Sequence, residues 1–179
     1  MPIPSTTFER FQRVATVWID ALDRYTPEQL IAKPADGGWS MGQIYNHLIQ
    51  TALRMQFREI DACLNGIGTA GGSKTLPGRL AFAIGSIPPI KIKGPPSREY
   101  TPEPTSDVAG LKLGMRGLID EMRVMAGKLE KAGGAIRRAK RNHPALGMLN
   151  AAEWYRLVEM HHRHHLRQKR RLDAFLGVQ

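Results

Sequence analysis

The sequence predicts an all-α protein, a bundle built from four long helices. Three observations lead to this prediction. Four stretches carry apolar residues at helical spacing, two of them begin with a compound helix-start pattern, and one long Gly- and Pro-rich segment separates the second stretch from the third. The composition, 42% hydrophobic and 23% charged, is typical of globular proteins. A length of 179 residues fits a single domain, which we expect to span residues 1–179.

The first long helix is predicted from about Thr7 to Arg24, where aromatic and aliphatic residues recur at helical spacing. A short helix should follow directly. Thr26 can cap it, Pro27 suits its first position, and Gln29 completes a capping box.

The second long helix is predicted to begin after Ser40, which can accept a bond from the first turn while Gln43 bonds back to its backbone. Trp39 and Ile44 occupy the two positions of a hydrophobic staple. The apolar face continues to residues 64–66. Three independent rules therefore agree on one helix start.

Residues 66–105 are rich in Gly and Pro, and we expect them to form a long irregular loop between helices 2 and 3. The prolines leave room for little more than a short strand at residues 90–93. A loop of this length in a compact domain is usually functional or flexible, so we expect it to shape a pocket.

The third long helix is predicted from Ser106 or Asp107 to the Gly133–Gly134 pair. The fourth has a second compound start, with Asn150 as cap, Glu153 as its capping-box partner, and a staple between the residues at 149 and 154. It should run to about Leu176, where a glycine can end it. Four such helices with connections of mixed length are typical of a bundle.

The formal net charge is +10, and most of it lies in one stretch. Residues 137–171 hold ten Lys and Arg against two Glu, together with five of the six histidines. An excess of this kind first indicates an anionic partner such as nucleic acid. No helix-turn-helix, zinc-finger or RNA-recognition pattern is present, however, and a charge run on a helix is usually a solvated face. These points argue against nucleic acid.

The lone Cys63 excludes an intramolecular disulfide framework and is typical of a reducing compartment. The N-terminal residues lack the pattern of a signal peptide. The most apolar stretch, residues 80–92, is far shorter than the roughly 20 residues of a spanning helix. We therefore expect a soluble, cytoplasmic protein with no membrane partner.

The fourth helix places histidines on its apolar stripe. His161 and His165 lie one turn apart on the inward face, and Gln168 lies on the next turn. His164 falls near the edge of that face, while His162 and Arg163 are predicted to point away. Imidazoles at positions i and i+4 can bind one metal ion.

The second helix offers a third imidazole. His47 interrupts its apolar stripe about two turns after the cap, so it can face His161 and His165 across the bundle. Three histidines with open positions are the form expected of a catalytic metal site. Two alternatives stay open on spacing alone: His47 as a hydrogen-bonded core histidine, and the His-His-Arg-His-His run as part of a solvated basic face.

Two segments carry a family resemblance. GWSMGQIYNHLI in the second helix and HPALGMLNAAEWYRLVEMHHRHHLRQ leading into the fourth resemble the DinB/YfiT-like superfamily, whose members share a Trp-Ser-x-x-Gln-Ile-x-x-His-Leu motif and a late His-x-x-His-His-x-x-Gln motif. The resemblance implies an up-down-down-up four-helix bundle that binds one divalent metal. Its ligands would be His47, His161 and His165. His164 matches the additional histidine beside them, and His143 matches a loop position that is structural or lines the pocket.

The resemblance also implies a function, either as a metal-dependent hydrolase or as an S-transferase that uses a low-molecular-weight thiol. An open metal position can acidify water or hold a thiolate. Zn and Ni are the leading metals, Ni only through the resemblance. We expect a small-molecule substrate, with an acidic thiol or a carboxylate favoured by the basic stretch, and a homodimer. Gln168 and His164 are candidate catalytic side chains. Cys63, about four turns from His47, is a poor candidate for the thiol. The alternative is a non-catalytic bundle that binds metal, nucleic acid or another anion.

Overall fold

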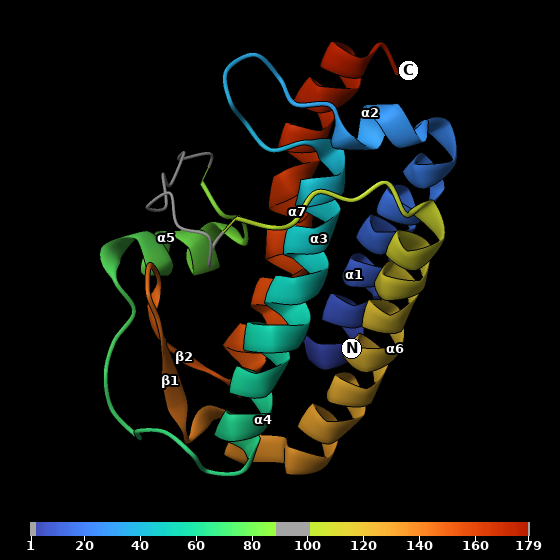
Figure 1. The fold of residues 1–179 in the computed structure, drawn as a ribbon. Coiled ribbons are helices and arrows are strands. Elements are labelled where there is room, and N and C mark those ends of the chain that lie inside the picture. The colour runs from blue at the N-terminus through green and yellow to red at the C-terminus, as the bar shows by residue number, and fades with distance from the viewer. Residues whose placement is uncertain (1–2, 89–100, 179) are drawn as a thin grey trace.

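The computed structural model describes residues 3–88 and 101–178. Long helical segments lie side by side and form the body of the molecule (Figure 1). They are α1 (Ile3–Ala21), α3 (Met41–Thr51) continued by α4 (Phe57–Leu64), α6 (Val108–Ala132) and α7 (Ala151–Leu176). The chain is mostly helical, as predicted. Within the described residues, no helix combines the length and apolar character needed to cross a membrane.

The N-terminal elements follow the predicted order. Helix α1 begins at Ile3, four residues earlier than expected, and a 3₁₀ turn (Leu22–Arg24) ends the segment. The short helix α2 (Pro27–Ile31) has the predicted capping box. The backbone N–H of Gln29 donates to Thr26 Oγ1 at 3.2 Å, and the N–H of Thr26 donates to Gln29 Oε1 at 2.9 Å.

Helix α3 begins as predicted, with both bonds of the Ser40–Gln43 capping box present. The expected continuous helix to residue 64 is interrupted, however. A π-helical turn (Ala52–Gln56) separates α3 from α4. Such turns insert an extra residue into the ladder and occur often beside functional sites. This one begins five residues after His47.

The expectation of an irregular loop over residues 66–105 is wrong in one part, because residues 76–84 form helix α5 (Leu76–Ile84). Thr75 Oγ1 accepts from the N–H of Gly78 at 3.1 Å, a proline lies in the first turn, and Gly85 ends the helix in the left-handed region at φ 66°. The prolines and glycines that argued for a loop therefore act as helix boundaries. The strand predicted at residues 90–93 lies outside the described residues.

The last two helices have the predicted boundaries. Asp107 caps α6 through Oδ1, which accepts from the N–H of Gly110 at 2.9 Å, and Gly133 follows its last residue. Asn150 and Glu153 form the capping box of α7, and Gly177 ends it at φ 68°.

A small β-hairpin, which the sequence analysis did not predict, lies between these helices in the otherwise helical fold. Strands β1 (Lys140–His143) and β2 (Gly147–Asn150) pair antiparallel, with Lys140 opposite Asn150. His143 Nδ1 accepts from the backbone N–H groups of Ala145 and Leu146 at 3.1 and 3.2 Å, which stabilises the turn. Four-residue strands show too little alternation to be recognised in a sequence.

The core is rich in aromatic side chains, and Trp18 connects three helices within it. Tyr45 of α3 donates its hydroxyl to the carbonyl of Trp18 at 2.6 Å, and their rings meet edge to face at 5.0 Å. The Trp18 indole N–H in turn donates to the carbonyl of His162 in α7 at 3.3 Å. All three side chains are fully buried.

The start of α3 is packed against backbone, which gives a test of this arrangement. A Cβ added at Gly42 would lie 2.1 Å from the carbonyl oxygen of Thr105 and 3.0 Å from that of Leu30. We expect Gly42→Ala to lower the free energy of unfolding by about 1–3 kcal/mol, because overpacking displaces backbone. Denaturant unfolding followed by circular dichroism measures it.

Gly117→Ala is the matched control, since Gly117 is an exposed position of α6 with nothing within 4 Å of an added Cβ. It should raise the free energy of unfolding by about 0.5–1 kcal/mol. Equal stabilisation by both substitutions would contradict the close contact at Gly42.

Candidate metal centre

The three predicted histidines lie together in the structure. His47 extends from α3, and His161 and His165 extend from successive turns of α7. Nε2 of His161 lies 3.1 Å from Nε2 of His47 and 3.1 Å from Nε2 of His165. One ring nitrogen from each residue falls within 4.8 Å of the other two. The three side chains are half-buried.

This arrangement fits a divalent metal ion. A zinc–imidazole bond of about 2.0–2.1 Å places two nitrogens of one tetrahedral ion roughly 3.3–3.4 Å apart. The observed spacing of 3.1 Å is close to that value. Three converging imidazole nitrogens suit Zn, Ni, Cu or Fe, and they suit Mg and Ca poorly, since those ions prefer oxygen.

The second ring nitrogens of His47 and His165 face neighbouring polar groups, and that of His161 does not. His165 Nδ1 lies 2.9 Å from Gln168 Oε1, so with the amide oxygen as acceptor the proton sits on Nδ1 and the Nε2 lone pair is free. His47 Nδ1 lies 3.4 Å from Thr51 Oγ1. His161 Nδ1 is buried and has no hydrogen-bond partner among the described residues.

Burial keeps the cluster neutral. It lowers the pKa of His47 to about 3 and that of His165 to about 4, and it holds the pKa of His161 well below its usual value. Neighbouring histidines lower all three further. Neutral imidazole is the form that binds metal, so the three rings are ready as ligands at pH 7.

The walls of the site come from several segments. The Trp39 ring lies against that of His47, with centroids 4.9 Å apart. Two parts of the Gly- and Pro-rich segment, at Ile87 and at Pro102, pack beside the histidine helices. Gln43 donates to the carbonyl of Pro102 at 2.8 Å, and His164 Nδ1 contacts the carbonyl of Ile87 at 3.2 Å. Trp39 as a wall and Thr51 as a partner of His47 were not predicted as site residues.

His164 does not belong to the cluster of three nitrogens. Its contact with the Ile87 carbonyl holds the chain that follows α5 against α7. Gln168, by contrast, touches a histidine of the cluster directly. The two candidate catalytic residues therefore differ in position: His164 lies beside the cluster, and Gln168 lies behind His165.

The prediction that His162 and Arg163 point away is wrong. His162 is fully buried, its Nδ1 lies 2.8 Å from the Val158 carbonyl, and its ring meets Phe11 edge to face at 5.0 Å. Arg163 is held by the buried Glu159 at 2.6 Å and donates to the carbonyl of Gly85 at 2.6 Å. Helix α7 packs against α1 on one side, and the end of α5 contacts it on another. Side chains on more than one face of α7 are therefore buried, and not only those of the predicted inward stripe.

Part of the basic stretch is also neutralised. Lys169 is buried and pairs with Asp173 at 2.7 Å, and the Tyr25 hydroxyl donates to the same carboxylate at 2.5 Å. Arg141 pairs with Glu59 at 2.6 Å. Lys169 therefore does not belong to the solvated face that a charge run on a helix usually forms.

Cys63 is buried, and burial raises the pKa of its thiol to about 11. A thiol in this state is a poor nucleophile and a poor metal ligand at neutral pH. This agrees with its exclusion on sequence grounds.

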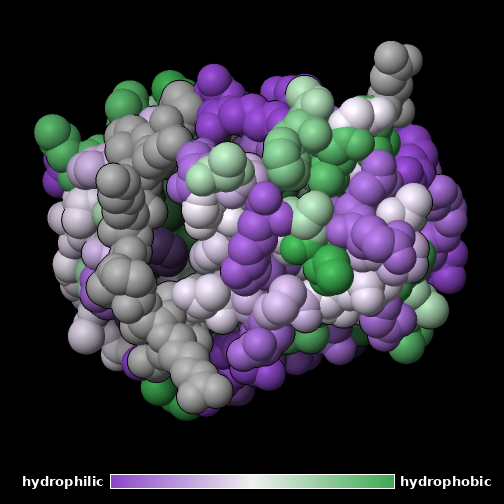
Figure 2. Space-filling model, turned by 45° about the horizontal axis from the view of Figure 1, so that its top comes forward, coloured by the Kyte–Doolittle hydropathy of each residue, from purple (hydrophilic) through white to green (hydrophobic). Residues whose placement is uncertain are grey.

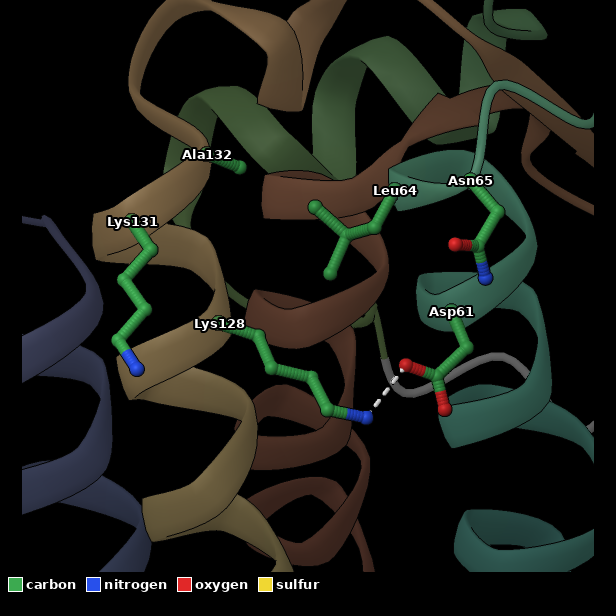
Figure 3. A pocket seen from close by; sticks show the side chains of 6 residues that line it. All are labelled: Asp61, Leu64, Asn65, Lys128, Lys131 and Ala132. Carbon is green, nitrogen blue, oxygen red and sulfur yellow. Dashed lines mark hydrogen bonds and ion pairs between the residues drawn. The ribbon is translucent and has the colours of Figure 1, made fainter.

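A separate pocket of about 440 Å³ lies between α4 and α6 (Figure 3). Its walls include the Asp61–Lys128 ion pair, Leu64 and Asn65. None of the clustered histidines lines it. The one acidic side chain of this pocket, Asp61, is paired with Lys128, and no group of three possible metal ligands lies there among the described residues, so the histidine cluster is the better candidate site.

A comparison with protein families shows to which family the chain belongs. The model of the DinB superfamily matches residues 10–168, which include His47, His161 and His165. The chain belongs to the DinB superfamily. Searches of curated proteins and of solved structures gave no significant match. Membership and the histidine cluster together are compatible with a metal-binding site.

The buried histidines predict acid sensitivity of the metal-free protein. Burial lowers the pKa values of His47, His162 and His165 to about 3–4, whereas the unfolded chain takes up these protons near pH 6.5. Between these values the unfolded state binds more protons, so stability is complete above about pH 6.5 and falls as the pH drops toward 4. Denaturant unfolding at several pH values, with a chelator present to keep the protein metal-free, measures this effect. The free energy of unfolding should be lower at pH 4.5 than at pH 7 by more than about 1 kcal/mol.

His162→Leu isolates this contribution from that of the carboxylates. It removes a buried imidazole whose pKa burial lowers to about 4, so the variant should show a shallower loss of stability with acid than wild type. Identical pH profiles for the two proteins would contradict the assignment of His162 as a neutral core residue.

Proposed function

We propose that this DinB superfamily protein is a metal-dependent enzyme in which His47, His161 and His165 hold one divalent ion, Zn or Ni. The observation that carries the proposal is the convergence of three neutral Nε2 atoms, two pairs of them 3.1 Å apart. When present, the ion supplies Lewis acidity that lowers the pKa of water or of a low-molecular-weight thiol, which creates a nucleophile for hydrolysis or S-transfer. The up-down-down-up arrangement of four helices and a homodimer belong to the same proposal.

The charges around the cluster favour an anionic small-molecule substrate. The groups that act on the pKa values of the three ligands are other histidines and the Gln168 amide, with no carboxylate among the described residues. Three neutral imidazoles leave a divalent ion uncompensated. A thiolate or a carboxylate would balance that charge where a neutral compound would not.

Gln168 and His164 act in this proposal as positioning residues. Gln168 fixes the ring and tautomer of His165 through Nδ1, which leaves Nε2 as the metal-facing atom. His164 holds the Ile87 carbonyl, so it keeps the chain after α5 close to the site.

Metal analysis of purified variants tests the site. Wild type loaded with Zn or Ni and then dialysed should retain about one ion per chain, because three imidazole ligands bind tightly. His47→Ala and His165→Ala should lose at least about tenfold in affinity, since each removes one of three ligands. The measurement is elemental analysis combined with competition against a chelator dye.

His143→Asn is the matched control, because His143 serves the β-hairpin turn and not the cluster. It should retain metal like wild type, with unchanged helical content in all variants. Metal retention in His47→Ala equal to wild type, or none in wild type, would contradict the site.

The reaction class is tested with the same proteins. Loaded wild type is assayed for ester and amide hydrolysis, and for consumption of small thiols with an aromatic electrophile. One of the two activities should depend on metal and disappear in His47→Ala. Stoichiometric metal without either activity, across acidic and neutral substrates, would favour the non-catalytic metal-binding alternative.

A further inference from the structure

The two ring nitrogens of His47 have different surroundings. Nε2 lies 3.1 Å from Nε2 of His161 and so faces the other imidazoles of the cluster. Nδ1 lies 3.4 Å from Oγ1 of Thr51, which is its one hydrogen-bond contact among the described residues. One side of the ring therefore faces the candidate metal position, and the other faces a hydroxyl group.

The backbone of α3 places this hydroxyl. Thr51 follows His47 by four residues, which puts the two side chains on the same face of the helix, one turn apart. Thr51 is the last residue of α3 and has α-helical dihedral angles, φ −63° and ψ −41°. The π-helical turn begins only at Ala52, so the regular helical spacing holds between His47 and Thr51. Threonine is also β-branched, and its hydroxyl has few allowed positions in a helix.

A histidine that binds metal needs its ring proton on the correct nitrogen. Neutral imidazole is the form that binds, and it offers a lone pair on one nitrogen while it carries its single proton on the other. Because Nε2 of His47 faces the cluster, the proton must lie on Nδ1, which then needs an acceptor. The oxygen of Thr51 can accept this bond, whereas the indole N–H of the neighbouring Trp39 can only donate.

The pair is partly shielded from water, which strengthens such a contact. Hydrophilic residues cover much of the face shown in Figure 2, and polar contacts on a surface of this kind compete with solvent. His47 and Thr51 are both half-buried, and the Trp39 ring lies against the imidazole with its centroid 4.9 Å away. An imidazole N–H that lost its acceptor here would be incompletely solvated, so removal of the Thr51 oxygen should have a measurable effect.

We propose that Thr51 is a positioning residue that accepts a hydrogen bond from Nδ1–H of His47 and so keeps the Nε2 lone pair directed at the cluster. This role rests on the proposed function, because a metal ion is what the lone pair would bind. Gln168 has the corresponding contact with His165 at 2.9 Å. Thr51 and Gln168 thus orient one ligand on each of the two helices, α3 and α7.

Nitrogen-15 NMR of the histidine rings tests the proposal on full-length protein kept metal-free with a chelator near pH 7. In wild type, His47 should carry its proton on Nδ1. Thr51→Val keeps the shape of the side chain but removes the acceptor, so the form of His47 with its proton on Nε2 should become populated. Thr51→Ser keeps the hydroxyl and should retain the wild-type form. A wild-type His47 with its proton on Nε2, or a Thr51→Val spectrum identical to that of wild type, would overturn the proposal.

Metal affinity gives a second readout, from competition of Zn or Ni with a chelator dye. Thr51→Val should bind about tenfold more weakly than wild type, which is the lower end of the effect of such hydrogen-bond partners because the contact is long. Thr51→Ser should recover most of this affinity. Equal losses in the two variants would assign the effect to packing and not to the hydrogen bond, and would overturn the proposal.

Thr16→Val is the matched control, because Thr16 is exposed on α1 and has no contact with the cluster among the described residues. It should match wild type in both measurements, and circular dichroism should be the same for all four proteins. A wild type that binds no metal would contradict the proposed function, while the spectra of the metal-free protein still decide the role of Thr51. A wild type and a Thr51→Val variant that bind metal equally well would contradict the role of Thr51 alone.

Discussion

Trp18 sets the register on which the histidine cluster depends. Its carbonyl accepts from Tyr45, two residues before His47, and its indole N–H donates to the carbonyl of His162, next to His161. One residue of α1 therefore ties the ligand-bearing turns of α3 and α7 to the same level of the bundle. A shift of α7 by one residue would rotate its side chains by about 100° and remove both imidazoles from His47. The capping boxes at Ser40 and Asn150 fix where each helix begins.

Burying the histidine cluster lowers the stability of the folded chain, which indicates that the cluster serves a function. Burial holds three imidazoles neutral beside one another, and His161 Nδ1 and His162 Nε2 are buried without partners among the described residues. Buried unsatisfied polar atoms are rare in native proteins unless function retains them. A bound ion would coordinate one nitrogen from each of the three rings and so stabilise the arrangement that the fold imposes.

Sequence patterns predicted the parts governed by local chemistry. The three capping boxes and the helical spacing of His161 and His165 are short-range features, and each is present in the structure. The failures involve contacts distant in sequence. His162 is buried because Phe11 and Trp18 of α1 cover that side of α7, and the β-hairpin forms against the chain before α5. Helix α5 had local caps at Thr75 and Gly85, but its exposed apolar face lacks the amphipathic pattern of a packed helix.

X-ray absorption at the edge of the bound metal tests the central claim most directly, because it reports which atoms surround the ion. The account predicts a first shell of light atoms at about 2.0–2.1 Å with the outer scattering of three imidazole rings, and loss of one ring's contribution in His47→Ala. A shell dominated by sulfur or by carboxylate oxygen, or an imidazole contribution unchanged in His47→Ala, would contradict it.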